Sequence, residues 1–153
     1  MFEDIVAPTG VMAALKVGSK KQLLQALSQR AANETGLDER RIYEVVTERE
    51  RIGSTGFGRG VAIPHGKVEG LAQVVGVFAQ LDQPIDYDAL DQQPVDLVFL
   101  LLAPDDAGAD HLKALAKVSR MFRNEAFVEK LRGARSQDAI VALLSTSGHS
   151  IAA

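Results

Sequence analysis

The sequence predicts an α/β domain in which helices cover both faces of one central β-sheet. Two dense apolar runs near the middle of the chain, Val74–Ala79 and Val95–Ala103, are typical of central strands that are buried on both faces. Segments with helical periodicity lie before and after these runs, so they can cover the two faces of one sheet. A third observation, a glycine-rich loop that leads into Pro64-His65-Gly66, concerns function more than fold.

The bulk composition indicates one ordinary globular domain. The chain has 153 residues, 46% of them hydrophobic and 24% charged, and we expect a single domain over residues 1–153 with an ordered core of about 3–145. The net charge is -3 and no basic run occurs, which disfavours nucleic acid as a partner. The absence of cysteine excludes disulfide frameworks, thiolate zinc sites and cysteine nucleophiles.

Neither end of the chain suggests insertion into a membrane. The first four residues, Met1-Phe2-Glu3-Asp4, carry two acidic side chains, and no basic region followed by an apolar core of a signal peptide is found there. The longest dense apolar stretch, Leu97–Ala103, is far too short to span a bilayer. These features predict a cytoplasmic protein.

Two helices are predicted in the first third of the chain. Ser19, with Gln22 three residues later, forms a capping box for the first helix, and Gly36 ends it. Asp38 can cap a second helix that ends near Glu50. The apolar face of the first helix is formed by Leu23, Leu24, Leu27 and Ala31.

Three more helices are predicted after Pro104, capped in turn by Asp110, Asn124 and Ser136. Leu112 is assigned to the apolar face of the first of these, and the tail from Ser145 is expected to fray. A short edge strand is expected around residues 85–87, between Pro84 and Pro94.

The segment that precedes His65 predicts a histidine held in a defined direction. Gly53–Gly60 is too rich in glycine to be helical and is interpreted as a loop. Val61–Ile63 forms a brief strand that Pro64 stops. Proline restricts its own backbone and that of the residue before it, while Gly66 removes bulk on the other side. We therefore expect the imidazole at the end of a strand.

An imidazole in this setting suits phosphoryl transfer. Its ordinary pKa near 6.5 leaves much of it neutral and nucleophilic, and a carbonyl that holds one ring N–H leaves the other nitrogen free. Such transfer requires mainly positioning and charge stabilisation. Loop amides and the hydroxyls of Ser54 and Thr55 could bind an anion, and a guanidinium could come from Arg49, Arg51 or Arg59.

Other ligands fit the sequence less well. The glycines of Gly56-x-Gly58-x-Gly60 precede a strand, whereas a dinucleotide fingerprint follows one and opens a helix. The histidines are too widely spaced for a metal motif, and the aspartates of residues 82–91 lack the ordered spacing of a calcium loop. We therefore predict no metal and no cofactor. His149, in the polar tail, is expected to have no functional role.

The run from Thr47 to Lys67, T-x-R-E-R-I-G-S-T-G-x-G-x-G-V-A-I-P-H-G-K, resembles the active-site signature of a known family. These are the fructose/mannitol-type enzyme IIA domains of the bacterial phosphotransferase system, and the nitrogen-regulatory branch, IIA-Ntr, is the most similar. The likeness continues through V-G-V-F-A-Q-L, D-x-Q-P-V-D-L-V-F-L-L-L-A-P and H-L-K-A-L-A-K-V-S-R, from about Ala14 to Leu144. It implies the fold of that family, a mixed central sheet with helices on both faces.

The resemblance also implies roles for individual residues. His65 matches the phosphorylated histidine, which reacts through the ring nitrogen farther from the backbone, and His111 matches the second active-site histidine. By its position alone, His111 would be a solvated residue of a first helical turn. Arg49 matches the arginine that stabilises phosphoryl charge, and the loop around the site matches Ser54, Thr55 and Gly56.

Partners follow from the resemblance as well. The phosphoryl donor would be the histidine phosphocarrier HPr or its nitrogen-branch paralogue NPr, and the regulated proteins would include potassium transporters or sensor kinases. Arg59 stands where relatives often carry a smaller polar residue, which could alter partner preference. Two alternatives stay open: a sugar-specific IIA component that passes phosphate to a separate permease domain, and a non-enzymatic module that binds an anion at the glycine loop.

Overall fold

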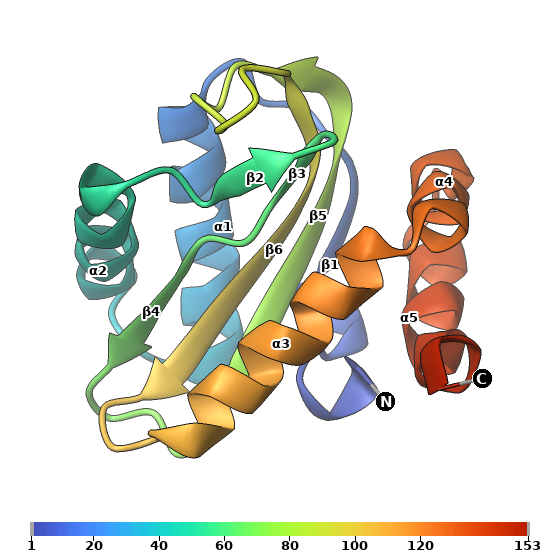
Figure 1. Cartoon of the computed structure of the whole chain (residues 1–153). Coiled ribbons are helices and arrows are strands. Elements are labelled where there is room, and N and C mark those ends of the chain that lie inside the picture. The colour runs from blue at the N-terminus through green and yellow to red at the C-terminus, as the bar shows by residue number, and fades with distance from the viewer. Residues whose placement is uncertain (1, 153) are drawn as a thin grey trace.

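The predicted α/β architecture, a single sheet with helices on both faces, is confirmed in a computed structural model of the chain (Figure 1). The structure describes the backbone of residues 2–152, and the side chains of these residues except 3 and 146–152. His149 therefore lies outside the described side chains. Within the described residues, no helix is both long and apolar enough to cross a bilayer.

The sheet is mixed and has six strands in the order β1-β5-β6-β3-β2, with β4 also paired to β6. β5 and β6 are antiparallel, whereas β1 runs parallel to β5, and β3 and β4 run parallel to β6. The strands are β1 (Val11–Leu15), β2 (Gly56–Gly58), β3 (Val61–Ala62), β4 (His65–Val68), β5 (Val75–Ile85) and β6 (Val95–Pro104).

The central position of β6 explains its apolar sequence, because both of its faces are covered. Leu100 and Leu102 belong to the core under the first two helices, whereas Phe99 and Leu101 belong to the core under the last three. This alternation is the period of two that a strand imposes on its side chains.

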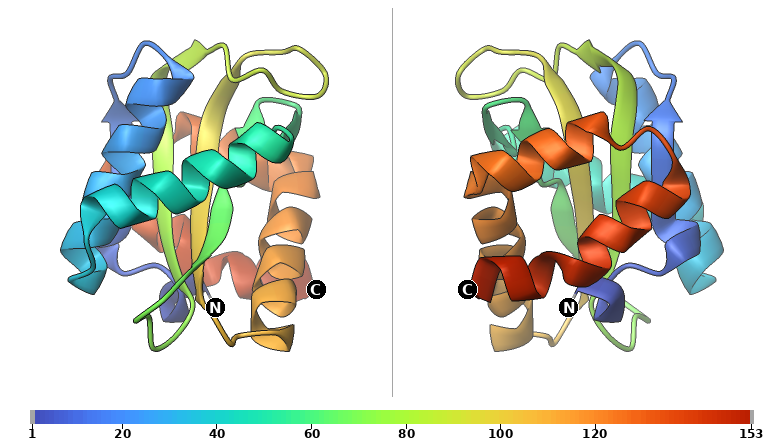
Figure 2. Two further views of the ribbon diagram at one scale, coloured as in Figure 1. Left: turned by 90° about the vertical axis from the view of Figure 1, so that its left-hand side faces the viewer. Right: turned by 90° about the vertical axis from the view of Figure 1, so that its right-hand side faces the viewer.

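Helices form a layer on each side of the sheet (Figures 1 and 2). The layer on one face consists of α1 (Lys20–Thr35) and α2 (Glu39–Ile52), and that on the other of α3 (Ala109–Arg123), α4 (Glu125–Gly133) and α5 (Gln137–Ala152). Two short 3₁₀ turns, η1 (Phe2–Asp4) and η2 (Pro8–Gly10), precede β1.

Most of the predicted helix ends are confirmed. The side chain of Ser19 accepts a hydrogen bond from the backbone of Gln22, and Gly36 ends α1 in the left-handed region with φ 76°. Asp38, Asn124 and Ser136 likewise accept backbone N–H groups at the starts of α2, α4 and α5.

The prediction for the start of α3 was wrong. Gly108 occupies the cap position, and no side chain caps the helix. Asp110 lies in the first turn, where its negative charge interacts favourably with the helix dipole. Leu112 was also assigned wrongly to the apolar face of this helix, because its side chain is 68% exposed. The backbone of α5 is helical to Ala152, and the fraying expected from Ser145 stays a prediction.

Three strand predictions also need correction. β1 was not predicted, and it lies at the edge of the sheet, paired with β5 alone. The separate edge strand expected around residues 85–87 is instead the end of β5, which continues past a register shift after Gln80 so that Ile85 still pairs with Val95. The stretch Gly53–Gly60, predicted to be loop throughout, contains β2, which pairs with β3.

Candidate active site

His65 lies where two short strands meet along β6. β3 ends at Ala62, Pro64 interrupts the pairing because it has no N–H, and His65 is the first residue of β4. The backbone N–H of Leu101 on β6 donates to the carbonyl of Pro64 at 2.9 Å, which keeps the segment against the sheet. The prediction of a strand end is therefore corrected: His65 begins a strand, and Pro64 forms the break before it.

A backbone carbonyl fixes the orientation of the His65 ring. Its Nδ1 lies 2.8 Å from the carbonyl oxygen of Ile63, and since a carbonyl can only accept, Nδ1 carries the hydrogen. In the neutral ring the lone pair is then on Nε2. The geometry thus provides the arrangement that the sequence predicted, one ring nitrogen held and the other free to react.

His111 lies beside His65, although the two come from different elements. The ring centroids are 5.7 Å apart and the ring planes are inclined by 61°. His111 is only 8% exposed, so the solvated position expected from its place in a first helical turn was wrong. Its Nε2 is buried and has no hydrogen-bond partner among the described residues. An unpaired buried N–H or lone pair is costly, so this nitrogen is available to pair with a group that enters the site.

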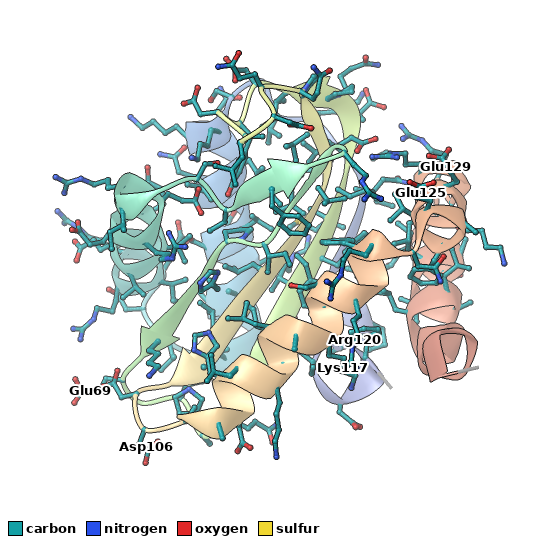
Figure 3. The ribbon with its side chains drawn as sticks, in the orientation of Figure 1. Glu69, Asp106, Lys117, Arg120, Glu125 and Glu129 are labelled. Atoms are coloured by element: carbon teal, nitrogen blue, oxygen red, sulfur yellow. The ribbon has the colours of Figure 1, made fainter. Side chains whose placement is uncertain are left out.

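Both histidines line an open depression of about 650 Å³ between α2 and β4. Residues of α2 at helical spacing form one wall, and β4 and the start of α3 form the other. The lining residues are Arg41, Glu44, Val45, Glu48, Arg49, Ile52, His65, Gly66, Lys67 and His111. Figure 3 shows Glu69 and Asp106 projecting beyond the ends of β4 and β6.

Arg49 supplies a guanidinium at the end of α2. Its Nη1 donates to the carbonyl of Gly53 at 2.8 Å, a contact that ties the side chain to the loop after the helix. Arg49 also lines the depression with the two histidines. The structure therefore brings together three of the six predicted site residues: His65, His111 and Arg49.

The other three, Ser54, Thr55 and Gly56, do not line the depression. Thr55 is 6% exposed, and its backbone N–H and its hydroxyl both donate to the carboxylate of Glu50. The hydroxyl of Ser54 accepts the N–H of Gly56 at 3.1 Å. A Cβ on Gly56 would lie 2.9 Å from the side chains of Tyr87 and Ala89, so this glycine permits close packing.

The electrostatic environment keeps both imidazoles neutral near pH 7. Burial lowers the pKa of His65 below the ordinary 6.5 and Arg49 lowers it further, while the bond to Ile63 and the charge of Glu50 oppose these effects. Burial also lowers the pKa of His111, and the nearby His65 and Lys67 act in the same direction. A neutral ring retains the lone pair that nucleophilic attack requires.

Sequence analysis missed several residues of this region. Buried Glu50 and Tyr87 and half-buried Lys20 form a polar cluster outside the lining of the depression. The glutamate in the R-E-R run at the end of α2 was the only local sign of this cluster. No group of three His, Asp or Glu side chains within the described part of the chain could hold a metal ion.

Replacing Gly66 with alanine should displace His65, because Gly66 packs directly on α2. An added Cβ would lie 2.5 Å from Cγ1 of Val45, which is closer than real atoms approach. On the sequence-based expectation that His65 is phosphorylated, Gly66→Ala should slow that reaction by about 10-fold, since small misplacements of reacting groups are costly. The measurement is the initial rate of phosphorylation by a phosphocarrier. The double variant Gly66→Ala/Val45→Ala removes the collision and should recover most of the rate; an equally slow double variant would contradict this explanation.

Fold and site together define an α/β domain that presents one histidine, held by a backbone carbonyl, beside a second histidine and an arginine. A family model described as "Phosphoenolpyruvate-dependent sugar phosphotransferase system, EIIA 2" matches residues 5–147. The chain belongs to this family, so it is a phosphotransfer component of the enzyme IIA type.

Individual relatives place the chain near one branch of the family. It is 54% identical over 142 residues to a "Nitrogen regulatory protein" of Bradyrhizobium diazoefficiens, with 93% of each chain covered. The crystal structure of nitrogen regulatory protein IIA-Ntr from Neisseria meningitidis matches with a TM-score of 0.88 at 35% identity, covering 94% of this chain and 98% of that one. The IIA mannitol structure from Escherichia coli, at 18% identity, TM-score 0.74 and 89% and 96% coverage, shares the fold.

Proposed function

We propose that this chain is a histidine phosphocarrier of the nitrogen-regulatory phosphotransferase branch, and that His65 accepts the phosphoryl group from an HPr or NPr carrier. The observation that carries the proposal is the 2.8 Å contact between His65 Nδ1 and the Ile63 carbonyl, which leaves Nε2 as the nucleophile at the depression. Membership of the enzyme IIA family supports the same chemistry.

The transfer is a direct exchange of one P–N bond for another. The lone pair of His65 Nε2 attacks the phosphorus of the phosphohistidine on the donor, and the electron pair of the breaking bond returns to the donor's imidazole. The ring of His65 becomes cationic, and its Nδ1–H stays on the Ile63 carbonyl, which stabilises that charge. Arg49 and the N–H of His111 are placed to bind the phosphoryl oxygens, while Ser54, Thr55 and Gly56 act by holding the loop beside Arg49.

A regulatory output follows from the same step. A phosphoryl group adds nearly two negative charges to a depression that already contains Glu44 and Glu48. A partner that binds one form therefore meets a different charge in the other. The 54% identity to a nitrogen regulatory protein supports this output, and potassium transporters or sensor kinases are the kinds of target that we propose.

The test is intact-mass spectrometry of the chain after incubation with phosphoenolpyruvate, enzyme I and either HPr or NPr. We expect one acid-labile phosphoryl adduct in the wild type and none in His65→Ala, and the ratio of initial rates ranks the two donors. An unmodified wild type with both active donors would overturn the proposal. The remaining hypothesis would then be a non-enzymatic module that binds an anion. Binding of inorganic phosphate without a covalent adduct would support that hypothesis.

The sugar-specific alternative shares the chemistry of His65 and differs in the acceptor. Phosphorylated chain incubated with a fructose- or mannitol-specific IIB domain separates the two, because a sugar-specific IIA should lose its adduct to IIB within seconds to minutes. Retention of the adduct supports the regulatory output.

The lowered pKa of His65 predicts a shift in the pH dependence of phosphorylation. Protonation of Nε2 removes the nucleophile, and because burial lowers the pKa, this happens at a pH below the ordinary 6.5. The rate should therefore fall at a lower pH than it would for an ordinary imidazole, with its midpoint below 6.5. The measurement is the initial rate against pH, together with an NMR titration of the His65 ring in the free chain. A midpoint at or above 6.5 in that titration would contradict the prediction.

A further inference from the structure

Among the described residues, Glu50 is the one acidic residue that is buried. It directly follows Arg49 on α2, and since successive helical residues differ by about 100°, the two side chains leave the helix on different faces. Arg49 faces the depression, whereas Glu50 is only 8% exposed and lies toward the interior. The core would not need a carboxylate here, because an apolar side chain could fill the space without the cost of desolvating a charge.

Every oxygen of the Glu50 carboxylate has a partner. Oε1 accepts the backbone N–H of Thr55 at 3.2 Å and pairs with Nζ of Lys20 at 2.9 Å. Oε2 accepts the hydroxyl of Thr55. Because that hydroxyl has only one hydrogen, the hydroxyl of Tyr87, 3.1 Å away, must be the donor to Thr55. Burial, and then the charge of Glu50, raises the pKa of Tyr87, which keeps this donor protonated.

The same cluster continues through the backbone to His65. The carbonyl of Thr55 accepts the N–H of Ile63 at 3.1 Å, and the carbonyl of Ile63 accepts Nδ1–H of His65 at 2.8 Å. Thr55 is therefore held by Glu50 on one side and holds Ile63 on the other. A displacement of Thr55 would move the carbonyl that orients the imidazole.

We infer that Glu50 is a positioning residue for His65, acting through the peptide groups of Thr55 and Ile63. The inference rests on the proposed phosphorylation of His65 and adds to it the device that fixes the ring. It also links the two parts of the site. Arg49 holds the carbonyl of Gly53 and Glu50 holds Thr55, so consecutive residues at the end of α2 fix the same loop at two points.

The charge of Glu50 adds an effect that a purely steric support would lack. Arg49 and Glu50 from α2 act on the pKa of His65 by their charges. The depression that His65 lines also contains Arg41, Glu44 and Glu48 from α2, Lys67 from β4 and His111 from α3. Among them Glu50 alone raises the pKa of His65 by its charge. Removing the negative charge should therefore lower that pKa further.

The principal variant is Glu50→Gln, which keeps the shape of the side chain and removes its charge and one acceptor. Thr55→Val is the milder second variant, because it loses the hydroxyl but keeps the backbone N–H that Glu50 binds. Glu39→Gln is the matched control, the same charge change in the first turn of the same helix, outside the lining of the depression.

The first readout is ¹⁵N NMR of the His65 ring in the unphosphorylated chain, which gives its titration midpoint and the fraction of the Nδ1–H tautomer. The second is the rate of phosphorylation by HPr or NPr, corrected for the folded fraction measured by circular dichroism. In Glu50→Gln we expect a lower midpoint, less Nδ1–H tautomer and a rate about 10- to 100-fold below wild type. Thr55→Val should lie between Glu50→Gln and wild type, and Glu39→Gln should match wild type.

Unchanged ring shifts and an unchanged midpoint in folded Glu50→Gln would overturn the inference, even if the variant is less stable, because Glu50 would then support the fold alone. If Glu50→Gln does not fold, Thr55→Val decides, and wild-type ring behaviour there overturns the inference. The NMR readout needs no donor. A wild type that is never phosphorylated therefore contradicts the proposed function, while the ring data still test the role of Glu50.

Discussion

Replacing Arg49 with methionine is expected to slow phosphorylation of His65 by about 100-fold or more. The guanidinium lines the depression beside His65, and its bond to the Gly53 carbonyl uses one N–H and leaves others for an anion. Phosphoryl transfer develops negative charge on the equatorial oxygens, so a positioned guanidinium stabilises the transition state. Methionine keeps much of the apolar stem and removes the charge. The measurement is the single-turnover rate of adduct formation at saturating donor.

Arg51→Met is the matched control for this prediction. Arg51 carries the same charge at the same end of α2, but it pairs with Glu48 at 2.9 Å and does not line the depression. We expect its rate to stay within about 2- to 3-fold of wild type, as for an exposed ion pair that contributes little. Equal losses in the two variants would mean that general surface charge, not a contact with the phosphoryl group, governs the rate.

Replacing His111 with phenylalanine is expected to slow phosphoryl transfer without lowering the stability of the fold. The buried Nε2 of His111 has no partner among the described residues, so removing it should leave the free energy of unfolding unchanged or raise it by up to about 1 kcal/mol. The ring of His111 lies beside that of His65, the proposed nucleophile, with ring centroids 5.7 Å apart. Loss of a hydrogen bond to an anionic group should slow transfer by about 10- to 100-fold. Urea unfolding and the single-turnover rate measure the two effects.

This pair of measurements separates a functional residue from a structural one. A structural His111 would give a destabilised variant with a rate that falls only with the folded fraction. A rate within about 3-fold of wild type in the folded variant would show that Nε2 makes no contact in the transition state. The lowered pKa of His111 also predicts that its contribution is made by the neutral ring near pH 7.

Local sequence determined most of the helices and the central strands. Ser19, Asp38 and Asn124 cap helices because a cap depends on a side chain and a backbone N–H two or three residues away. The apolar run of β6 is continuous because both faces of the strand are covered, and the sequence shows that directly. Asp110 was misassigned as a cap because the cap of α3 is Gly108, which has no side chain to signal its role.

Short and edge strands were harder to predict for a physical reason. β1 is held by pairing with β5, which lies far from it in the sequence, and β2 is held by pairing with the very short β3. A strand of five or fewer residues also shows little periodicity in its own sequence. The continuation of β5 to Ile85 depends on a register shift opposite β6, which only the paired strands define. Such elements are specified by their partners more than by their own composition.

The sequence by itself determined the nucleophile of the proposed chemistry and how it is held. Pro64-His65-Gly66 limits the backbone locally, so the ring had to be presented in a fixed direction, and the carbonyl of Ile63, two residues away, orients it. Tertiary structure alone decided what surrounds it. His111 reaches His65 because α3 packs against β6, the strand that pairs with β4. Thr55 turns away from the depression because Glu50 and Tyr87 satisfy its hydroxyl. Contacts between side chains from separate elements depend on how those elements pack, and no pattern within one element contains that information.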